Sequence, residues 1–182
     1  MLACLDVGYG PRGALAACVS IRDWSDAEPA SQCQLTIDDV AEYEPGQFYR
    51  RELPCLSAIL ATLPRRPAVV VIDGYVDLDD RHRPGLGRHL HESLDRAVPV
   101  IGVAKNPYRQ TKHAAEVRRG SSDRPLFETA AGTPIDRAAG HIAVMHGRHR
   151  IPTILKTVDR LSRRFDSSAS MEPDRHDDRG VE

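Results

Sequence analysis

The stretch "RPAVVVIDGY", residues 66–75, runs four apolar residues directly into Asp73, which is followed by Gly74. A continuous Val and Ile run is typical of a strand buried on both faces, as in the centre of a parallel sheet. An aspartate that ends such a strand is either a turn residue or a ligand. The sequence on either side decides between these two interpretations.

The segments before and after this strand predict the fold class. Apolar runs and alternation predict an antiparallel meander of three strands, at 2–9, 13–21 and 31–38. Helical spacing and further apolar runs then predict a second series of elements: a helix at 48–63, the strand at 68–73, a helix at 85–97, a strand at 98–105, short strands at 114–119 and 125–130, and helices at 133–147 and 151–164. This order predicts an α/β protein with a ribonuclease H-like mixed sheet, three antiparallel strands and then parallel strands, flanked by helices.

Composition indicates one globular domain. The chain has 182 residues, of which 41% are hydrophobic, and we expect the domain to cover residues 1–165. The segment 166–182 holds six acids and two arginines with few apolar residues, which predicts a disordered acidic tail. No apolar run is long enough for a membrane span, and the N-terminus has no signal-peptide pattern. We therefore expect a cytoplasmic protein that does not bind membranes.

Two further acids and a lysine bear on the role of Asp73. Asp6 lies within the first apolar strand and Glu52 near the start of a helix. A charge in a buried strand costs several kcal/mol unless it is paired or binds a metal. Two acids on strands that can be neighbours favour a ligand over a turn residue, and carboxylate oxygens suit Mg²⁺ or Mn²⁺. Lys105 ends a strand at the same expected edge, where it holds a phosphate, orients a water, or extends into solvent.

The positive charge is concentrated in two segments, 105–119 and 148–164. Such clusters either follow a phosphate backbone or form a solvated basic face, and charge alone leaves both interpretations open.

Several motifs together resemble the endonuclease V family. They are "LDVGY" at 5–9, "YEPGQFYRRELP" at 43–54, "VVVIDG" at 69–74, "IGVAK" at 101–105 and the C-terminal helix at 149–164. The resemblance implies a metal-dependent endonuclease with a ribonuclease H-like fold that acts in DNA repair. It implies a cut on the 3′ side of a deaminated purine, which is hypoxanthine in DNA or inosine in RNA.

The resemblance also assigns roles to single residues. Asp6, Glu52 and Asp73 would be the catalytic carboxylates that bind Mg²⁺ or Mn²⁺, and Lys105 the active-site lysine. The implied partner is a nucleic acid, DNA or RNA, with a deaminated base, and we expect the protein to act as a monomer.

The same resemblance implies a wedge that opens the duplex at the lesion. Tyr43, with Pro45 and Gly46, would form this wedge. A rigid, flat tyrosine ring suits this role because it fills the gap that a flipped base leaves.

The match to the family weakens after residue 106. A family histidine in a "Ser-Pro-Gly-His" stretch is absent, and the linear register places Gly132 at its position. His82, His113 and His141 are candidates to replace it in space. The alternative to an active nuclease is therefore a catalytically impaired nucleic-acid-binding relative of the same fold.

Overall fold

The computed structural model describes residues 1–10, 13–42, 44, 46–108 and 112–166. These residues form a seven-stranded mixed sheet with strand order β3-β2-β1-β4-β5-β7-β6. The strands are β1 (Leu2–Gly10), β2 (Gly13–Ile21), β3 (Ser31–Ile37), β4 (Val69–Asp73), β5 (Val100–Ala104), β6 (Ala115–Val117) and β7 (Leu126–Ala131). The helices are α1 (Tyr49–Ala61), α2 (Leu86–Ser93), α3 (Ile135–Val144), α4 (Thr153–Ser162) and the 3₁₀ helix η1 (Arg163–Asp166).

The strand directions confirm the predicted mixed sheet. Strands β1, β2 and β3 pair antiparallel as the expected meander, and β1, β4 and β5 pair parallel. The two later strands, β7 and β6, continue the sheet in antiparallel pairs beyond β5. The element order is that of a ribonuclease H-like fold.

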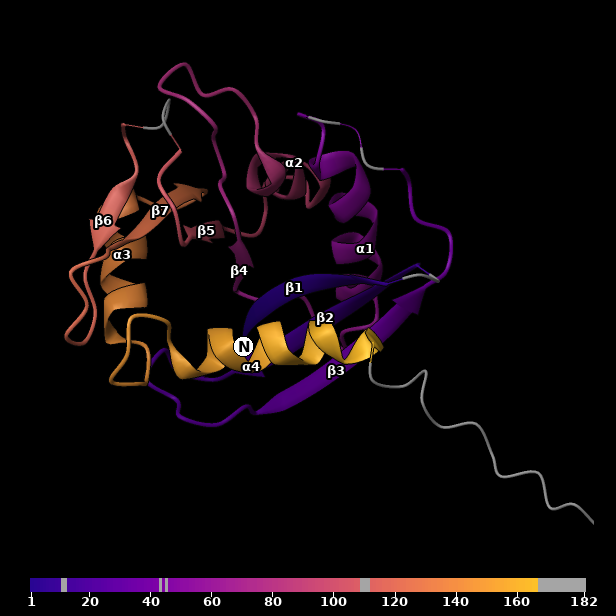
Figure 1. The fold of residues 1–182 in the computed structure, drawn as a ribbon, viewed down its shortest axis with the longest axis horizontal. Helices are drawn as coiled ribbons and strands as arrows, with labels where there is room; N and C mark the ends of the chain where they lie inside the picture. The colour runs from indigo at the N-terminus through magenta and orange to yellow at the C-terminus, as the bar shows by residue number, and fades with distance from the viewer. Residues whose placement is uncertain (11–12, 43, 45, 109–111, 167–182) are drawn as a thin grey trace, which may run out of the picture.

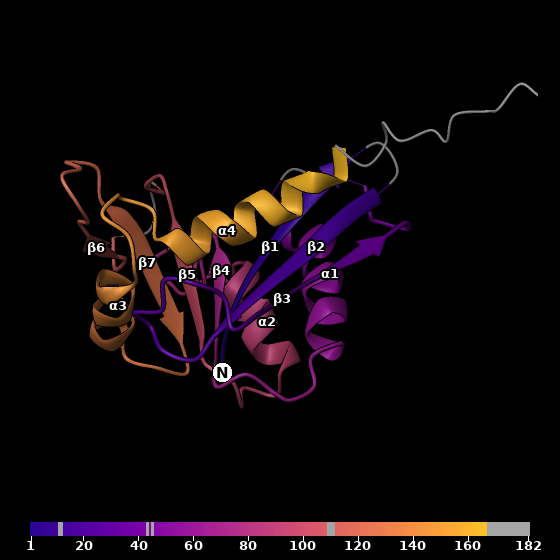
Figure 2. The same ribbon diagram turned by 90° about the horizontal axis from the view of Figure 1, so that it is seen from below.

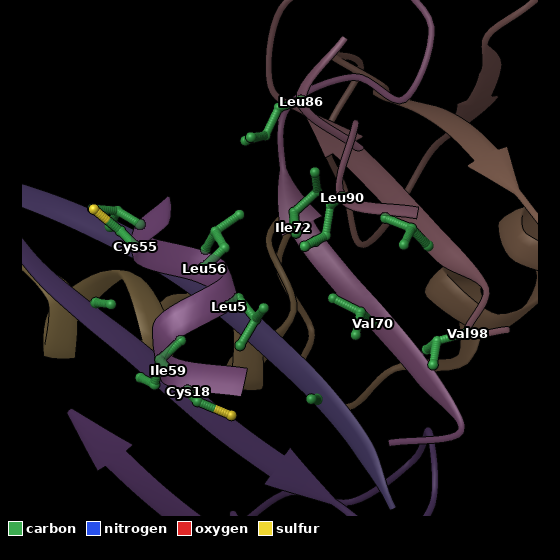
Figure 3. Close-up of a cluster of buried hydrophobic side chains, with 14 of the residues drawn as sticks. Leu5, Cys18, Cys55, Leu56, Ile59, Val70, Ile72, Leu86, Leu90 and Val98 are labelled. Carbon is green, nitrogen blue, oxygen red and sulfur yellow. The ribbon is translucent and has the colours of Figure 1, made fainter. Parts of the chain in front are cut away.

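Helices cover both faces of the sheet. Figures 1 and 2 show α1 and α2 on one face, with α4 crossing the strands on the other and α3 beside β6 and β7. Each face buries its own apolar cluster. Figure 3 shows the cluster beneath α1 and α2, where Leu56 and Ile59 of α1 pack with Leu5 and Ile72 of the central strands. The second cluster joins α3 and α4 to the opposite face of the same strands.

The strand register places the first two predicted acids side by side. Leu5 of β1 pairs with Ile72 of β4, so Asp6 and Asp73 are the next residues on two neighbouring parallel strands. Both acids lie two residues beyond members of the α3–α4 cluster, Cys4 and Val71. Since side chains alternate along a strand, both carboxylates point to the face that α4 covers.

The end of α4 lies directly against β1. A Cβ atom at Gly8 would lie only 2.1 Å from the carbonyl oxygen of Ser162, so a residue without a side chain is required there. Glycine at this position lets the last turn of α4 reach the strand that carries Asp6.

Part of the positive charge in the two basic segments is structural. The guanidinium of Arg119 is buried and donates to the carbonyl oxygens of Met145, Gly147 and His149. Arg150 donates to carbonyl oxygens as well, those of Lys105 and Pro125. These two arginines are therefore unavailable to a phosphate backbone, although other basic residues of the segment 148–164 remain exposed.

Two expectations concern the chain as a whole. Residues 167–182 of the predicted acidic tail lie outside the described residues. Among the helices that the structure describes, none has the length and apolar character needed to cross a membrane.

Candidate active site

The predicted carboxylates and lysine meet at the carboxyl edge of the parallel strands. Asp6, Asp73 and Lys105 line one cavity of about 310 Å³, and each comes from a different central strand or its end. Lys105 lies two residues beyond Val103, which pairs with Asp73, so it extends from the same edge. The edge is also where open α/β sheets place their ligands.

Asp6 is held by a hydrogen bond from the last helix. The hydroxyl of Ser162 donates to Asp6 Oδ2 across 2.6 Å. Burial raises the pKa of Asp6 above its ordinary value, the hydrogen bond from Ser162 lowers it, and the negative charges of Asp73 and Asp159 raise it again. The net shift is upward, so the surroundings of Asp6 favour its protonated form more than water does, and the Ser162 hydrogen bond offsets part of that effect.

Glu52 reaches the same edge from α1, on the other face of the sheet. Its side chain is buried, with 8% of the residue exposed. Burial raises the pKa of Glu52 to about 8, and repulsion from Asp6 and then Asp73 contributes in the same direction. This repulsion shows that the three predicted carboxylates are close enough to share one electrostatic environment.

Lys105 joins two acids across the cavity. Its Nζ lies 2.6 Å from Asp73 Oδ2 and 3.5 Å from Asp159 Oδ1. Burial by itself would lower the pKa of Lys105, but the hydrogen bond and the charge of Asp73, together with Asp159, raise it overall. The ammonium is therefore charged and fixed in direction at neutral pH.

Asp159, in α4, is a site residue that sequence reasoning missed. Its Oδ1 accepts from Arg163 Nη2 at 2.9 Å as well as contacting Lys105, and its side chain lines the cavity. The sequence does carry a weak signal, because this acid stands between Val158 and Leu161 on the apolar side of the helix. The family resemblance included this helix but gave no role to Asp159.

Comparison with known proteins decides the family. A model of the family described as Endonuclease V matches residues 1–160. The chain belongs to the Endonuclease V family. Family membership indicates a nuclease, which is a hydrolase of phosphodiester bonds, and it agrees with a cluster of carboxylates at a sheet edge.

Individual relatives of the Endonuclease V family support the assignment. Endonuclease V of Streptomyces avermitilis is 28% identical over 181 residues, which cover 88% of this chain and 78% of that protein. A crystal structure of Endonuclease V from the same organism superimposes with a TM-score of 0.73 at 25% identity, covering 93% of this chain and 82% of the other. Ciona intestinalis Endonuclease V, crystallised with a 24mer DNA that contains an inosine, gives a TM-score of 0.77 at 18% identity, covering 93% of this chain and 86% of the other.

The donor set at this edge fits a hard divalent cation. Asp6, Glu52 and Asp73 offer only carboxylate oxygens, which suit Mg²⁺ or Mn²⁺. Burial is the main cause of the raised pKa values of Asp6 and Glu52, and repulsion from neighbouring acids adds to both, which a bound cation would offset. Within the described residues, however, these three acids do not form a group whose ligand atoms all lie within 4.8 Å of one another. The carboxylates therefore surround a wider space than a preformed metal cage.

A second, smaller cavity adjoins Asp73. Its volume is about 190 Å³, and its lining residues are Gly46, Phe48, Tyr49, Asp73, Gly74, Tyr75, Leu78, Pro84, Gly85 and Leu86. Gly46 and Gly74 have φ angles of +80° and +124°, and a Cβ atom at either position would meet nothing within 4 Å. Glycine is required there by the backbone conformation.

The predicted wedge is described only in part. Gly46 lines the smaller cavity, whereas Tyr43 and Pro45 lie outside the described residues. Phe48 and Tyr49, which follow the wedge motif, also line this cavity. The wedge role of Tyr43 therefore stays a prediction.

The prediction that Gly132 stands where an active-site histidine belongs is wrong. Strand β7 runs antiparallel to β5, with Ala131 paired to Val100 at the start of β5. Gly132 follows Ala131, next to Pro99 and His91, and therefore lies at the opposite end of the sheet from Asp73. The linear register failed because it did not include this reversal of strand direction.

The three histidines considered as replacements have other partners. His141 stacks on Trp24, with ring centroids 4.5 Å apart, and does not line either cavity. His82 and His113 lie near each other on two loops, with ring centroids 5.5 Å apart. Neither of these two residues lines the cavity that holds Asp6 and Lys105.

Proposed function

We propose that this protein is a Mg²⁺- or Mn²⁺-dependent endonuclease that cuts a phosphodiester on the 3′ side of a deaminated purine. The base would be hypoxanthine in DNA or inosine in RNA. One observation carries the proposal: Asp6, Asp73 and Asp159 line one cavity at the edge of the sheet, where Lys105 contacts Asp73 and Asp159, and the charges of Asp6 and Asp73 act on the buried Glu52. Membership of the Endonuclease V family and the relative crystallised with inosine-containing DNA support it.

The chain's own residues would supply distinct parts of the reaction. Asp6, Glu52 and Asp73 would hold the cation by their carboxylate oxygens. When bound, such an ion activates water and stabilises the leaving oxygen of a phosphodiester. The hydroxyl of Ser162 donates to Asp6 and so favours the ionised form, which offsets part of the rise in its pKa that burial causes.

Lys105 would position the substrate phosphate. Its ammonium is held between Asp73 and Asp159, so its direction is fixed before any substrate arrives. A preorganised cation at a partly enclosed edge stabilises negative charge on a phosphate without reorganising at the moment of reaction. Its raised pKa keeps it protonated over the whole range in which the acids ionise.

The smaller cavity would receive the deaminated base. It shares Asp73 with the carboxylate site, so a base inside it would lie close to the site that cuts one nucleotide further on the 3′ side. Aromatic and glycine residues form much of its wall, which leaves a narrow space for a flat ring. A side chain at Gly46 or Gly74 would enter this space, because an added Cβ there meets no other atom.

A cleavage assay tests the proposal. Purified protein is incubated with oligonucleotides carrying one deoxyinosine or one inosine, in Mg²⁺, Mn²⁺, Ca²⁺ or EDTA. We expect one cut 3′ to the lesion in Mg²⁺ or Mn²⁺, none in EDTA, and none with Asp73→Ala. Lesion-dependent binding in Ca²⁺ without cleavage in any metal would overturn the proposal. That result would instead support the impaired nucleic-acid-binding relative.

A further inference from the structure

A second group of potential metal ligands lies outside the carboxylate site. Asp77, His82 and His113 each offer one ligand atom, and these atoms all lie within 4.8 Å of one another. The first two residues belong to the loop that follows β4, and His113 belongs to the loop that precedes β6. No residue of this group lines the cavity that holds Asp6, Asp73 and Lys105.

Two ligand atoms of the group already face one another. His82 Nδ1 lies 2.9 Å from Asp77 Oδ2, so these two atoms can share one ion without a change of side-chain direction. His113 Nδ1 lies 3.1 Å from Asp80 Oδ1, a carboxylate outside the group. A metal-binding histidine characteristically contacts such a carboxylate through one ring nitrogen, which fixes the tautomer and leaves the other nitrogen as a ligand. The rings of His82 and His113 have centroids 5.5 Å apart.

The supporting residues hold the group rigidly. Asp77 is 3% exposed and accepts two hydrogen bonds from the guanidinium of Arg88, at 2.8 and 2.7 Å. Asp80 Oδ1 also accepts from the backbone N–H groups of Lys112 and His113, at 2.9 and 3.2 Å. Both carboxylates are therefore held by contacts other than those with the two imidazole rings.

His82 adopts a backbone conformation that the surroundings must impose. Its φ is +57°, in the left-handed region that a residue with a side chain seldom occupies. Such strain persists only where other contacts determine it, and it is concentrated at ligand sites. The His82 side chain is nevertheless 70% exposed, so an ion can reach it from solvent.

We propose that Asp77, His82 and His113 bind a transition-metal dication of the Zn²⁺ class. Two imidazoles and one carboxylate suit Zn²⁺ and disfavour Mg²⁺, and three protein ligands leave one position for water. This ion is distinct from the catalytic cation and does not depend on the proposed nuclease activity. It would join the two loops, and the loop after β4 also lines the smaller cavity through Leu78 and Pro84.

Cobalt binding tests the site, because tetrahedral Co²⁺ absorbs in the visible range. Protein freed of metal is titrated with Co²⁺ and then with Zn²⁺ as competitor, as wild type and as His82→Ala, His113→Ala and the double variant. His149→Ala, an exposed histidine elsewhere, and Asp73→Asn serve as controls. We expect one tetrahedral Co²⁺ per chain, displaced by Zn²⁺, with affinity at least about tenfold weaker in each cluster variant and unchanged in the controls. Binding that is equal in wild type and the double variant would overturn the site, as would absence of binding by wild type at micromolar metal.

A second measurement needs no substitution. Zn²⁺ should slow modification of His82 and His113 by diethylpyrocarbonate at least about tenfold, as measured by mass spectrometry of peptides. His149 in the same sample provides the internal control and should react at an unchanged rate. Equal rates at all three histidines with and without Zn²⁺ would exclude the site even if the alanine variants failed to fold.

Discussion

Two buried glutamates, Glu52 of α1 and Glu128 of β7, have raised pKa values in different electrostatic surroundings. Burial raises the pKa of both Glu52 and Glu128 to about 8. Around Glu52, the acids Asp6 and Asp73 raise it further, whereas the one charge acting on Glu128 is Arg119, which lowers it. A shifted pKa therefore marks a candidate catalytic site only where several acids share the shift beside a cavity.

The surroundings of Glu128 differ from those of Glu52. Glu128 is fully buried in β7, and neither of its oxygens has a hydrogen-bond partner among the residues that the structure describes. Arg119 contributes charge, but its hydrogen bonds go to backbone carbonyl groups. Glu128 therefore carries a burial cost without the repulsion from neighbouring acids that acts on Glu52, and the two glutamates make a matched pair for experiments.

The largest expected difference between the two regions is in cleavage. Asp6→Asn and Glu52→Gln should each lower the rate of deoxyinosine cleavage by about 100-fold or more, because loss of a ligand should cost at least as much as the 10–100-fold loss of an outer partner. Glu128→Gln should change the rate less than about twofold. The measurement is single-turnover cleavage in Mg²⁺. A large loss of activity in a folded Glu128→Gln variant would contradict the expected difference between Glu52 and Glu128.

The next largest difference is expected in how much Mg²⁺ stabilises variants of Glu52 and Glu128. Mg²⁺ at about 100 times its dissociation constant should stabilise wild type by about 2.7 kcal/mol, read as a rise in Tm. The same rise is expected for Glu128→Gln, and a much smaller one for Glu52→Gln, since that variant lacks a carboxylate oxygen for the ion. An equal rise in both variants would show that Glu52 is not a ligand.

The pH dependence of stability tests the surroundings of Glu128. The pKa of Glu128 rises from 4.5 to about 8 on folding, so the folded state binds its proton more tightly. Its contribution to the free energy of unfolding therefore falls as pH rises from about 4.5 to about 8. Glu128→Gln should reduce the loss of stability over this window by at least about 1 kcal/mol, or roughly 2–4 °C in Tm.

The control for that experiment is Glu116→Gln, an exposed acid on β6. Thermal unfolding of wild type and both variants is followed at pH 5 and pH 8.5, without divalent metal. Identical pH slopes in wild type and Glu128→Gln would contradict the buried, ionisable state of Glu128.

The smallest expected effect concerns Ser162. Its hydroxyl lowers the pKa of Asp6, so Ser162→Ala should raise that pKa and move the acid limb of the pH–rate profile to higher pH. We expect a few-fold loss of cleavage at pH 6 and little loss at pH 9, with about 1 kcal/mol lower stability. A uniform loss at every pH would indicate that the hydroxyl only supports packing.

The central strands and their acids were predictable from local pattern. Apolar runs identified β1, β4 and β5, and parallel pairing then required Asp6, Asp73 and Lys105 to share an edge. For Asp159 the pattern carried only a weak signal, because its place in the site depends on how α4 crosses the sheet. That crossing is determined by the apolar cluster on the second face and by the close contact at Gly8, neither of which is local in sequence.

The later part of the chain shows where a linear comparison fails. The expectation for Gly132 assumed that β7 runs in the same direction as β5, so that its last residues reach the edge that holds Asp73. Antiparallel pairing of β7 with β5 reverses this relation and takes Gly132 to the far end. The loop group of Asp77, His82 and His113 was equally hidden, since its two loops are separated by about thirty residues and by α2 and β5.

The hydrogen bond between Ser162 and Asp6 joins residues 156 positions apart, near the two ends of the domain. A ribosome making this chain releases Asp6, Glu52, Asp73 and Lys105 long before Asp159 and Ser162. The nascent protein therefore lacks two members of the proposed site until α4 has left the exit tunnel and docked on β1. The order of synthesis delays assembly of this site until its last helix is available.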